Sequence, residues 1–226
     1  MPWYCYQGLE VMGQFKNMDA AKLIKGYDMG KMFVDRHHFA GKTALDIGAG
    51  HCAHTLAFAE KFDRVDAIDI IDDVQWTDLK TISSKAEKVN FFLQDAHLIN
   101  HLHDKYDLIY SLSAFEHFED WKKVMNHIPN LLNPGGKFYL VISPLYYSQY
   151  GHHLDPEMKE WEHILFPEKE LKEQFKKRGG VDWKWQLYTE LNKATAAELI
   201  EEAQKLFKIS YLKADITSIE MICDQK

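Results

Sequence analysis

The chain has 226 residues, 46% of them hydrophobic, and a formal net charge of −7 at pH 7. This length and apolar content predict one globular domain and exclude a wholly disordered chain. No apolar run is long enough to span a bilayer, the acid excess disfavours a nucleic-acid partner, and three scattered cysteines form no disulfide or zinc framework.

The N-terminal part, residues 1–40, is expected to be a helical cover. Apolar periodicity predicts two short helices, over residues 18–25 and 29–37, with Gly26 between them. The first residues contain neither a basic leader nor an apolar segment, so we expect a cytoplasmic protein. These helices precede the first predicted strand and are placed to cover its ligand-binding end.

The next segment is an apolar run that ends in an acid and two closely spaced glycines. Residues 44–52 read Ala-Leu-Asp-Ile-Gly-Ala-Gly-His-Cys, and a helix is expected over residues 53–62. A strand that turns sharply into a helix gathers backbone N–H groups where nucleotide-like ligands bind. Glycine can adopt positive φ and lets a ligand lie against the main chain. The pattern therefore predicts a nucleotide-binding turn at Gly48 and Gly50.

A second acid follows at the end of the next predicted strand, residues 65–69. Asp69 stands about 20 residues after the glycine turn, where a carboxylate can accept hydrogen bonds from both hydroxyls of a ribose. The two features together predict an adenosine pocket. They are shared by NAD sites and S-adenosylmethionine sites.

Further strands and a glycine-rich connection complete the series. Residues 90–95 end at Asp95, and residues 106–111 end at Ser111. Apolar steps of three and four predict a helix over residues 121–132, which Pro134-Gly135-Gly136 stops before a strand over residues 137–143. In this order and spacing, residues 41–143 resemble the class I S-adenosylmethionine-dependent methyltransferases, especially the group that acts on small molecules.

The resemblance implies an α/β fold with a Rossmann-like, doubly wound, mostly parallel sheet of seven strands. The last strands are expected to pair antiparallel at the sheet edge. The implied activity is transfer of the methyl group of S-adenosyl-L-methionine, which leaves S-adenosyl-L-homocysteine. Many members have glycine where this chain has Cys52, so contact there is expected through the backbone or a small side chain.

The resemblance also implies a set of cofactor-binding residues at the strand ends. The methionine part of the cofactor is expected near Asp46, Gly48, Ala49, Gly50, His51 and Cys52. The ribose is expected at Asp69, with Ile70 beside it, and the adenine edge at Asp95 and Ala96. Ser111, at the end of the fourth strand, completes the set.

Residues 144–192 leave this alternation and are rich in aromatic residues and histidine. Long insertions of this kind in compact domains are often lids or binding elements, so we expect a substrate lid here, with a helix of its own after Pro167. Residues 193–226 are expected to form the last helix, begun by a capping box at Thr195 and Glu198. Two strands, over residues 207–212 and 216–222, are expected to follow it.

Histidine is the first candidate for a general base, because its pKa lies near the operating pH. In the fold that the resemblance implies, the loop after the fourth strand opens toward the methyl group, which makes His117 and its neighbour Glu116 candidates. His152 and His153 in the lid are the others, although only one of two adjacent side chains on extended backbone is expected to face the pocket. The competing interpretation is that all four are packing or hydrogen-bonding residues of the loop and lid.

Other functions stay open at this stage. A metal-assisted methyl transfer would draw ligands from His152, His153, Asp155 and His163, but their spacing matches no strong metal signature, and we expect no metal. An NAD-binding oxidoreductase is disfavoured because His54 and Thr55 stand near the place of its third glycine. A binding module without catalysis is a further alternative.

The expected partner is a small-molecule acceptor, aromatic, sugar-like or cationic, because aromatic residues concentrate in the predicted lid. The segment 111–114 reads Ser-Leu-Ser-Ala and lacks the Asn/Asp-Pro-Pro-aromatic motif common in nucleic-acid amino methyltransferases. The sequence leaves the methylated atom and the oligomeric state open.

Overall fold

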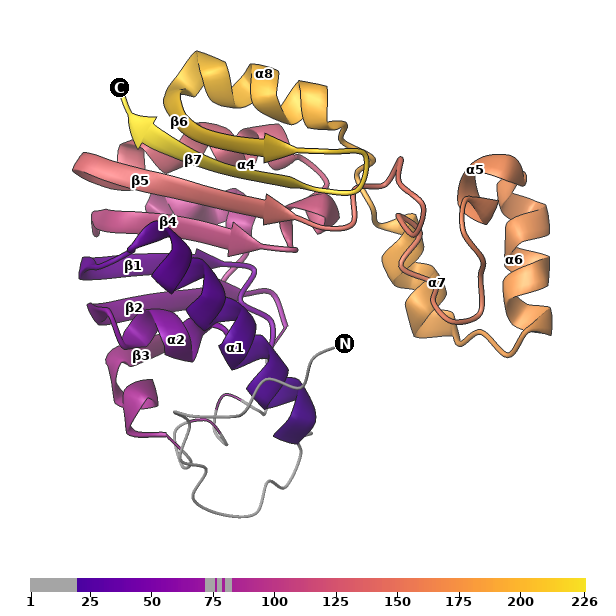
Figure 1. Cartoon of the computed structure of the whole chain (residues 1–226), viewed down its shortest axis with the longest axis horizontal. Helices are drawn as coiled ribbons and strands as arrows, with labels where there is room; N and C mark the ends of the chain where they lie inside the picture. The colour runs from indigo at the N-terminus through magenta and orange to yellow at the C-terminus, as the bar shows by residue number, and fades with distance from the viewer. Residues whose placement is uncertain (1–19, 72–75, 77–78, 80–82) are drawn as a thin grey trace.

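The computed structural model describes residues 20–71, 76, 79 and 83–226. At its centre is a seven-stranded sheet with the order β3-β2-β1-β4-β5-β7-β6 (Figure 1). The strands are β1 (Gly41–Ile47), β2 (Phe62–Asp69), β3 (Val89–Leu93), β4 (Tyr106–Leu112), β5 (Leu132–Ile142), β6 (Phe207–Ala214) and β7 (Ile219–Gln225). Strands β1 to β5 are parallel, and β7 runs antiparallel to both of its neighbours. This confirms the predicted fold class.

Helices cover both faces of the sheet, which is why the central strands are continuous apolar runs. One face packs against α1 (Ala20–His37) and α2 (Thr55–Ala59), and the other against α4 (Trp121–His127) and α8 (Ala196–Leu206) (Figure 1). The predicted capping box at Thr195 and Glu198 begins α8. No helix in the described part of the chain is long and apolar enough to cross a bilayer.

The N-terminal prediction of two helices is wrong, because α1 continues through Gly26 without a break. The glycines of this helix permit close packing. A Cβ added at Gly26 would lie 2.6 Å from the Cβ of Ala53, and one at Gly30 would lie 2.5 Å from the backbone oxygen of His54. The helix therefore lies directly on the segment after the glycine turn. The start of the first predicted helix, at residues 18 and 19, lies outside the described residues.

Other element boundaries also differ from the prediction. The helix expected over residues 53–62 is only α2, since β2 already begins at Phe62. The helix expected over residues 121–132 ends at His127, continues as a 3-10 turn over Ile128–Leu131, and gives way to β5 at Leu132. The Pro-Gly-Gly segment therefore belongs to a long strand. The pairing with β4 shifts its register at this segment, because Tyr106 pairs with Leu132 and Leu108 with Lys137, so regular pairing resumes at Lys137, where the predicted strand begins.

The predicted lid is a helical insertion between β5 and α8. It contains α5 (Glu162–Leu165), α6 (Glu168–Lys177) and α7 (Asp182–Thr189), of which only the helix after Pro167 was predicted. Figure 1 shows these helices beyond the carboxyl ends of β4 and β5. They enclose a separate apolar cluster of Tyr146, Leu154, Met158, Leu171, Phe175, Trp185, Tyr188 and Leu191. The lid thus holds its own small core at the end of the sheet where ligands bind in such folds.

Candidate active site

The glycine turn joins β1 to α2 and has the backbone that its sequence predicts. Gly48 has φ +77° and Gly50 has φ +51°. The N–H groups of Gly48 and Ala49 both donate to the Ile68 carbonyl at 3.0 Å, which fastens the turn to β2. A Cβ at Gly48 would lie 2.4 Å from the Ala114 Cβ, whereas one at Gly50 would meet no atom within 4 Å. Gly50 therefore faces open space, where a ligand can approach the main chain.

Asp69 and the glycine turn are held together by hydrogen bonds. One carboxylate oxygen of Asp69 accepts from the Gly50 N–H at 2.8 Å, and the other accepts from the Ile71 N–H at 3.0 Å. The carbonyl of the same residue, Gly50, accepts a hydrogen bond from the Trp76 indole N–H at 2.8 Å. Sequence reasoning missed Trp76, since no periodic pattern around it indicated a contact. These bonds fix the second acid beside the turn, as the adenosine pocket requires.

Asp46 is fully buried at the end of β1. Its Oδ2 accepts from the Thr55 hydroxyl at 2.6 Å and lies 3.0 Å from His54 Nε2, while its Oδ1 has no hydrogen-bond partner among the described residues. Burial and the charge of Asp46 raise the pKa of Tyr110 well above its usual range. A buried carboxylate with one free oxygen is suited to a ligand that donates a hydrogen bond.

A cavity of about 250 Å³ opens at the turn. It is lined by Leu23, Gly26, Gly48, Ala49, Gly50, His51, Cys52, Ala53, His54, Leu112 and Ser113. Cys52 is buried with φ +56°, a left-handed conformation that favours glycine. The departure from the family's glycine at this position therefore keeps the glycine-like backbone. The structure brings the predicted turn residues 48–52 into one cavity wall.

The other predicted cofactor residues surround the adjoining strand ends. Ile70 follows Asp69 and is 70% exposed, and Leu93 at the end of β3 is 62% exposed, so apolar surface adjoins the acid. The Asp95 carboxylate caps the 3-10 helix Ala96–His101 by accepting from the His97 N–H at 2.8 Å. That backbone hydrogen bond lowers the pKa of Asp95. Half of its side chain is still open to solvent.

Ser111 lies inside the sheet and does not line the cavity. Its hydroxyl donates to the Ile47 carbonyl at 2.8 Å, which ties β4 to the end of β1. The cavity is lined instead by the next two residues, Leu112 and Ser113. Sequence reasoning missed them because the strand was expected to end earlier, and because Ser113 leaves the strand with φ +52°.

Glu116 and His117 follow β4 in a short 3-10 turn, Phe115–His117, and their side chains face different surroundings. Glu116 is 5% exposed, neither carboxyl oxygen has a hydrogen-bond partner among the described residues, and burial raises its pKa to about 8. It borders a small cavity beside Tyr146 and Asn192, at the base of the lid, and not the glycine-turn cavity. The backbone N–H of Asn192 donates to the Glu116 carbonyl at 2.9 Å, so the far end of the lid clamps this turn.

His117 lies beside His153 of the lid, with ring centres 5.4 Å apart and planes at 74°. Burial lowers the pKa of His117 to about 4, and burial also lowers the pKa of His153. His117 Nδ1 has no partner among the described residues, and His153 Nε2 lies 3.4 Å from the Pro144 carbonyl. The structure therefore unites one histidine from each predicted group as a pair of neutral rings.

His152 takes the opposite direction, into the lid interior. It is fully buried, its Nδ1 accepts from the Leu154 N–H at 2.8 Å, and its ring centre lies 5.1 Å from that of His163. His163 in turn lies 2.7 Å from the Tyr146 carbonyl. The two adjacent rings thus face different neighbours, and the positive φ of His153, not alternation along extended backbone, separates them.

The residues considered as metal ligands do not converge. Within the described residues, no group of three or more His, Cys, Asp or Glu side chains is placed to hold a metal ion. His152 and His153 face different neighbours, as described above. The alternative of a metal site at His152, His153 and Asp155 therefore has no ligand set in the described structure.

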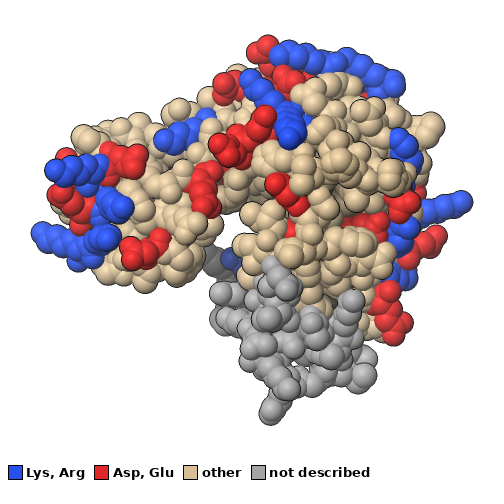
Figure 2. Space-filling model, turned by 180° about the vertical axis from the view of Figure 1, so that it is seen from behind, with Lys and Arg blue, Asp and Glu red and all other residues tan. Residues whose placement is uncertain are grey.

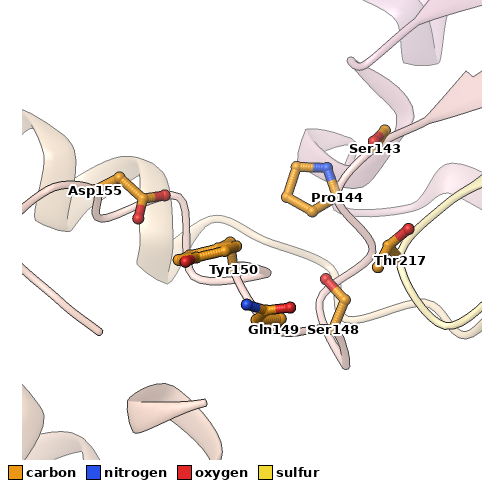
Figure 3. Close-up of a pocket in the computed structure, with 7 residues that line it drawn as sticks. All are labelled: Ser143, Pro144, Ser148, Gln149, Tyr150, Asp155 and Thr217. Carbon is orange, nitrogen blue, oxygen red and sulfur yellow. The ribbon is translucent and has the colours of Figure 1, made fainter. Parts of the chain in front are cut away.

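A second, larger cavity of about 550 Å³ lies between the lid and the sheet (Figure 3). Its lining residues are Ser143, Pro144, Ser148, Gln149, Tyr150, Asp155 and Thr217. The Ser113 hydroxyl, on the wall of the glycine-turn cavity, donates to the Ser143 carbonyl at 3.3 Å. The His117–His153 pair adjoins Pro144. The two cavities are thus neighbours, and the histidine pair adjoins the larger one through Pro144.

Comparison with known proteins gives one family. A family model described as a methyltransferase domain matches residues 28–182. Phosphoethanolamine N-methyltransferase 2 of Caenorhabditis elegans is 28% identical over 134 residues, which are 58% of this chain and 30% of that protein. Malonyl-[acyl-carrier protein] O-methyltransferase 1 of Ilyobacter polytropus is 27% identical over 135 residues, which are 59% of this chain and 47% of that protein. The chain thus spans less than half the length of either relative.

Solved structures share the fold at low sequence identity. The N-methyltransferase NodS of Bradyrhizobium japonicum, in complex with S-adenosylhomocysteine, has a TM-score of 0.56 at 14% identity, over 90% of this chain and 87% of that chain. The magnesium protoporphyrin IX methyltransferase of Synechocystis, with bound S-adenosylmethionine, has a TM-score of 0.55 at 14% identity, over 95% of this chain and 86% of that chain. At this level of identity the likeness concerns the fold.

Proposed function

The chain belongs to the class I methyltransferase-domain family, and on that premise we propose that it transfers a methyl group from S-adenosylmethionine to a nitrogen or oxygen atom of a small molecule held under the lid. The observation that supports this best is the adjacency of the two cavities. One opens on the glycine turn and the other on the lid, and Ser113 and Ser143 join their walls.

The residues at the turn fit the cofactor. Gly50 presents bare main chain to open space, Asp69 lies beside it with a carboxylate for the ribose hydroxyls, and Asp46 Oδ1 is a buried acceptor without a partner. We assign Asp46 to the ammonium group of the methionine part, directly or through a water, and Ile70 to the adenine face. Asp95 and Ala96 are assigned to the adenine edge, with residues 48–52 around the methionine part.

S-adenosylmethionine supplies an electrophilic methyl group carried on a sulfonium. The protein's contribution to such a displacement is mainly alignment of the acceptor and exclusion of water. The lid is placed to align the acceptor, because Pro144, Ser148, Gln149, Tyr150 and Asp155 line the larger cavity. An N–H or O–H acceptor must also lose a proton, so a nearby base adds to the rate.

We assign the removal of this proton from the acceptor to the His117–His153 pair. Both rings are buried enough to stay neutral near pH 7, and His117 Nδ1 is free to accept a hydrogen bond. With a pKa lowered to about 4, His117 is neutral and can accept a hydrogen bond from the N–H or O–H of the acceptor. Glu116 and His152 are not assigned this role, because their side chains face other surroundings.

The direct test follows methyl transfer from S-adenosylmethionine labelled with 13C in the methyl group, in the presence of a panel of small amines and alcohols. We expect a new methyl resonance with at least one acceptor and release of S-adenosylhomocysteine. His117→Ala and His153→Ala are expected to lower turnover at least tenfold while S-adenosylhomocysteine affinity stays within twofold. Unchanged turnover in both variants would remove the histidine pair from the mechanism.

The transfer experiment, together with calorimetric titrations of S-adenosylhomocysteine and NAD, distinguishes the alternative functions. A binding module without catalysis would bind S-adenosylhomocysteine in a calorimetric titration yet transfer no label to any acceptor. An oxidoreductase would bind NAD and ignore S-adenosylhomocysteine. Either outcome would replace the proposed function.

A further inference from the structure

The residues that line the larger cavity, under the lid, indicate which kind of ligand it binds. On the premise of the proposed function, we propose that this cavity binds the acceptor through a cationic nitrogen, with the Asp155 carboxylate as counter-charge and the Tyr150 ring as the apolar wall. The acceptor is thus an amine or quaternary ammonium compound with a small polar remainder. Nitrogen as the atom that receives the methyl group is not required by this proposal, since the cation serves for binding.

The charge of the cavity is the first argument. Among the described residues that line it, Asp155 carries the only charge, and the other polar groups are Ser143, Ser148, Gln149, Tyr150 and Thr217. A cavity with one carboxylate and no lysine or arginine in its lining attracts cations and repels anions. Figure 2 shows a hollow between the lid and the sheet, with acidic side chains at its upper border. The net charge of −7 acts in the same direction.

The orientation of Asp155 is the second argument. Figure 3 shows its carboxylate pointing into the space between Tyr150 and Pro144, and the residue is exposed. Its backbone carbonyl accepts from the Lys184 ammonium at 2.6 Å, while that ammonium also donates to the Glu157 carboxylate at 2.9 Å and 2.8 Å. The nearby lysine is therefore engaged with Glu157 and the main chain. The Asp155 carboxylate stays available to a ligand.

The placement of Tyr150 is the third argument. Its hydroxyl donates to the Glu160 carboxylate at 2.6 Å, which anchors the phenol and holds the ring at the edge of the cavity. An aromatic face next to a carboxylate binds ammonium groups by cation–π attraction and by charge. A second carboxylate, that of Glu160, lies at the hydroxyl end of the ring and adds negative potential.

The cavity also lies where an acceptor is needed. Burial lowers the pKa of His153, while its contact with the Pro144 carbonyl and the negative charge of Asp155 oppose that shift, so the carboxylate acts on the His153 ring. Pro144 lines the cavity and contacts His153 through its carbonyl. A cation seated at Asp155 would leave the rest of the molecule directed along Pro144 toward the turn cavity.

The test compares two probes of equal shape. Choline and its uncharged carbon isostere, 3,3-dimethylbutan-1-ol, are titrated by calorimetry into the full chain saturated with S-adenosylhomocysteine. We expect choline to bind at least tenfold more tightly than the isostere, and its affinity to fall as salt is added. Equal binding of the two probes, or no binding of choline to the loaded protein, would overturn the proposal.

Variants locate the site. Asp155→Asn is expected to reduce choline affinity about tenfold with S-adenosylhomocysteine affinity unchanged, whereas Asp63→Asn, an exposed acid at the start of β2, changes neither. Tyr150→Phe keeps the ring and is expected to bind nearly as well as the parent, but Tyr150→Leu loses about tenfold. Loss of choline binding that does not follow Asp155 or Tyr150 would place the cation elsewhere. Failure of the parent protein to bind S-adenosylhomocysteine would instead reject the proposed function.

Discussion

The glycine turn and the base of the lid are built in opposite ways. At the turn, the main-chain groups are matched, because Asp69 accepts hydrogen bonds from the Gly50 and Ile71 N–H groups and the Trp76 indole N–H donates to the Gly50 carbonyl. The nearby Asp46 side chain keeps a buried oxygen, Oδ1, that has no partner among the described residues and that we assign to the cofactor. At the base of the lid, both Glu116 oxygens and one nitrogen of His117 are buried without partners in the described structure. Unpartnered buried polar groups cost free energy and are retained where function uses them.

This difference indicates that the turn serves mainly to bind the cofactor, and the base of the lid mainly to act on the acceptor. A turn whose bonds are already made is preorganised, so it binds its ligand without reordering. The unmatched groups at the lid base lower the stability of the folded state, a cost that we connect with their use during turnover. We therefore expect substitutions at the turn to change cofactor affinity, and substitutions at the lid base to change turnover and pH dependence.

The largest expected effect concerns the pH dependence that Glu116 gives to stability. Its pKa is raised to about 8 in the folded protein from an ordinary 4.5, so between these values the folded state holds a proton that the unfolded state releases. Stability therefore falls as pH rises through this window and levels off above pH 8. At about 1.4 kcal/mol per pKa unit the full effect is about 5 kcal/mol.

Urea unfolding of the parent and of Glu116→Gln from pH 5 to pH 9 measures this effect. The glutamine variant keeps the shape without the titration, so its stability relative to the parent is expected to increase with pH. The exposed neighbour provides the control Glu119→Gln, which should show no such trend. A constant difference between parent and Glu116→Gln across the range would show that the carboxyl is not buried in neutral form.

Alanine substitutions at the two glycines of the turn are expected to have different effects, on protein stability at Gly48 and on cofactor binding at Gly50. Gly48→Ala combines a positive φ with a Cβ 2.4 Å from the Ala114 Cβ, so we expect a loss of about 3 kcal/mol of stability. Gly50→Ala meets no protein atom within 4 Å and should cost only about 1 kcal/mol. Its methyl group points into the space assigned to the cofactor, however, and should weaken S-adenosylhomocysteine binding at least tenfold. Normal binding by Gly50→Ala would mean that the cofactor lies elsewhere.

Asp69→Ala is expected to weaken S-adenosylhomocysteine binding by about 1–3 kcal/mol, because the ribose hydroxyls lose their charged acceptor and the Gly50 N–H loses its partner. Calorimetric titration measures the change, with Asp63→Ala on the same strand as the matched control. Equal affinities of the Asp69 variant and the parent would remove the ribose assignment.

The smallest expected effect tests Trp76. Trp76→Phe keeps the stacking on Phe91, whose ring centre is 5.3 Å away, but removes the hydrogen bond to the Gly50 carbonyl. We expect S-adenosylhomocysteine affinity to fall by about 1 kcal/mol, with turnover at saturation little changed. A loss of turnover at unchanged affinity would contradict the division between turn and lid base.

The sequence predicted the turn well because its signals are local. Apolar strands that end in Asp46 and Asp69, with glycines placed for positive φ, determine both the backbone and the ligand-binding end. The capping box at Thr195 was predicted for the same reason, since its hydrogen bonds lie within one helical turn. Such features need no knowledge of the rest of the fold.

The orientations of the side chains could not be predicted from local sequence signals. His153 has a positive φ, so alternation along extended backbone does not describe its relation to His152. Gly26 was interpreted as a helix breaker, because only the folded structure shows the turn residue Ala53 against it. Trp76 and Asn192 act through contacts with distant segments, and no spacing in the sequence indicates those contacts.

The most direct test of the account is a crystal structure of the complex with S-adenosylhomocysteine. We predict the ribose hydroxyls on Asp69, the main chain of Gly50 against the ligand, and the sulfur near Ser113, directed toward the His117–His153 pair and the cavity under the lid. A ligand bound away from the glycine turn, or a sulfur directed away from the lid, would contradict the account.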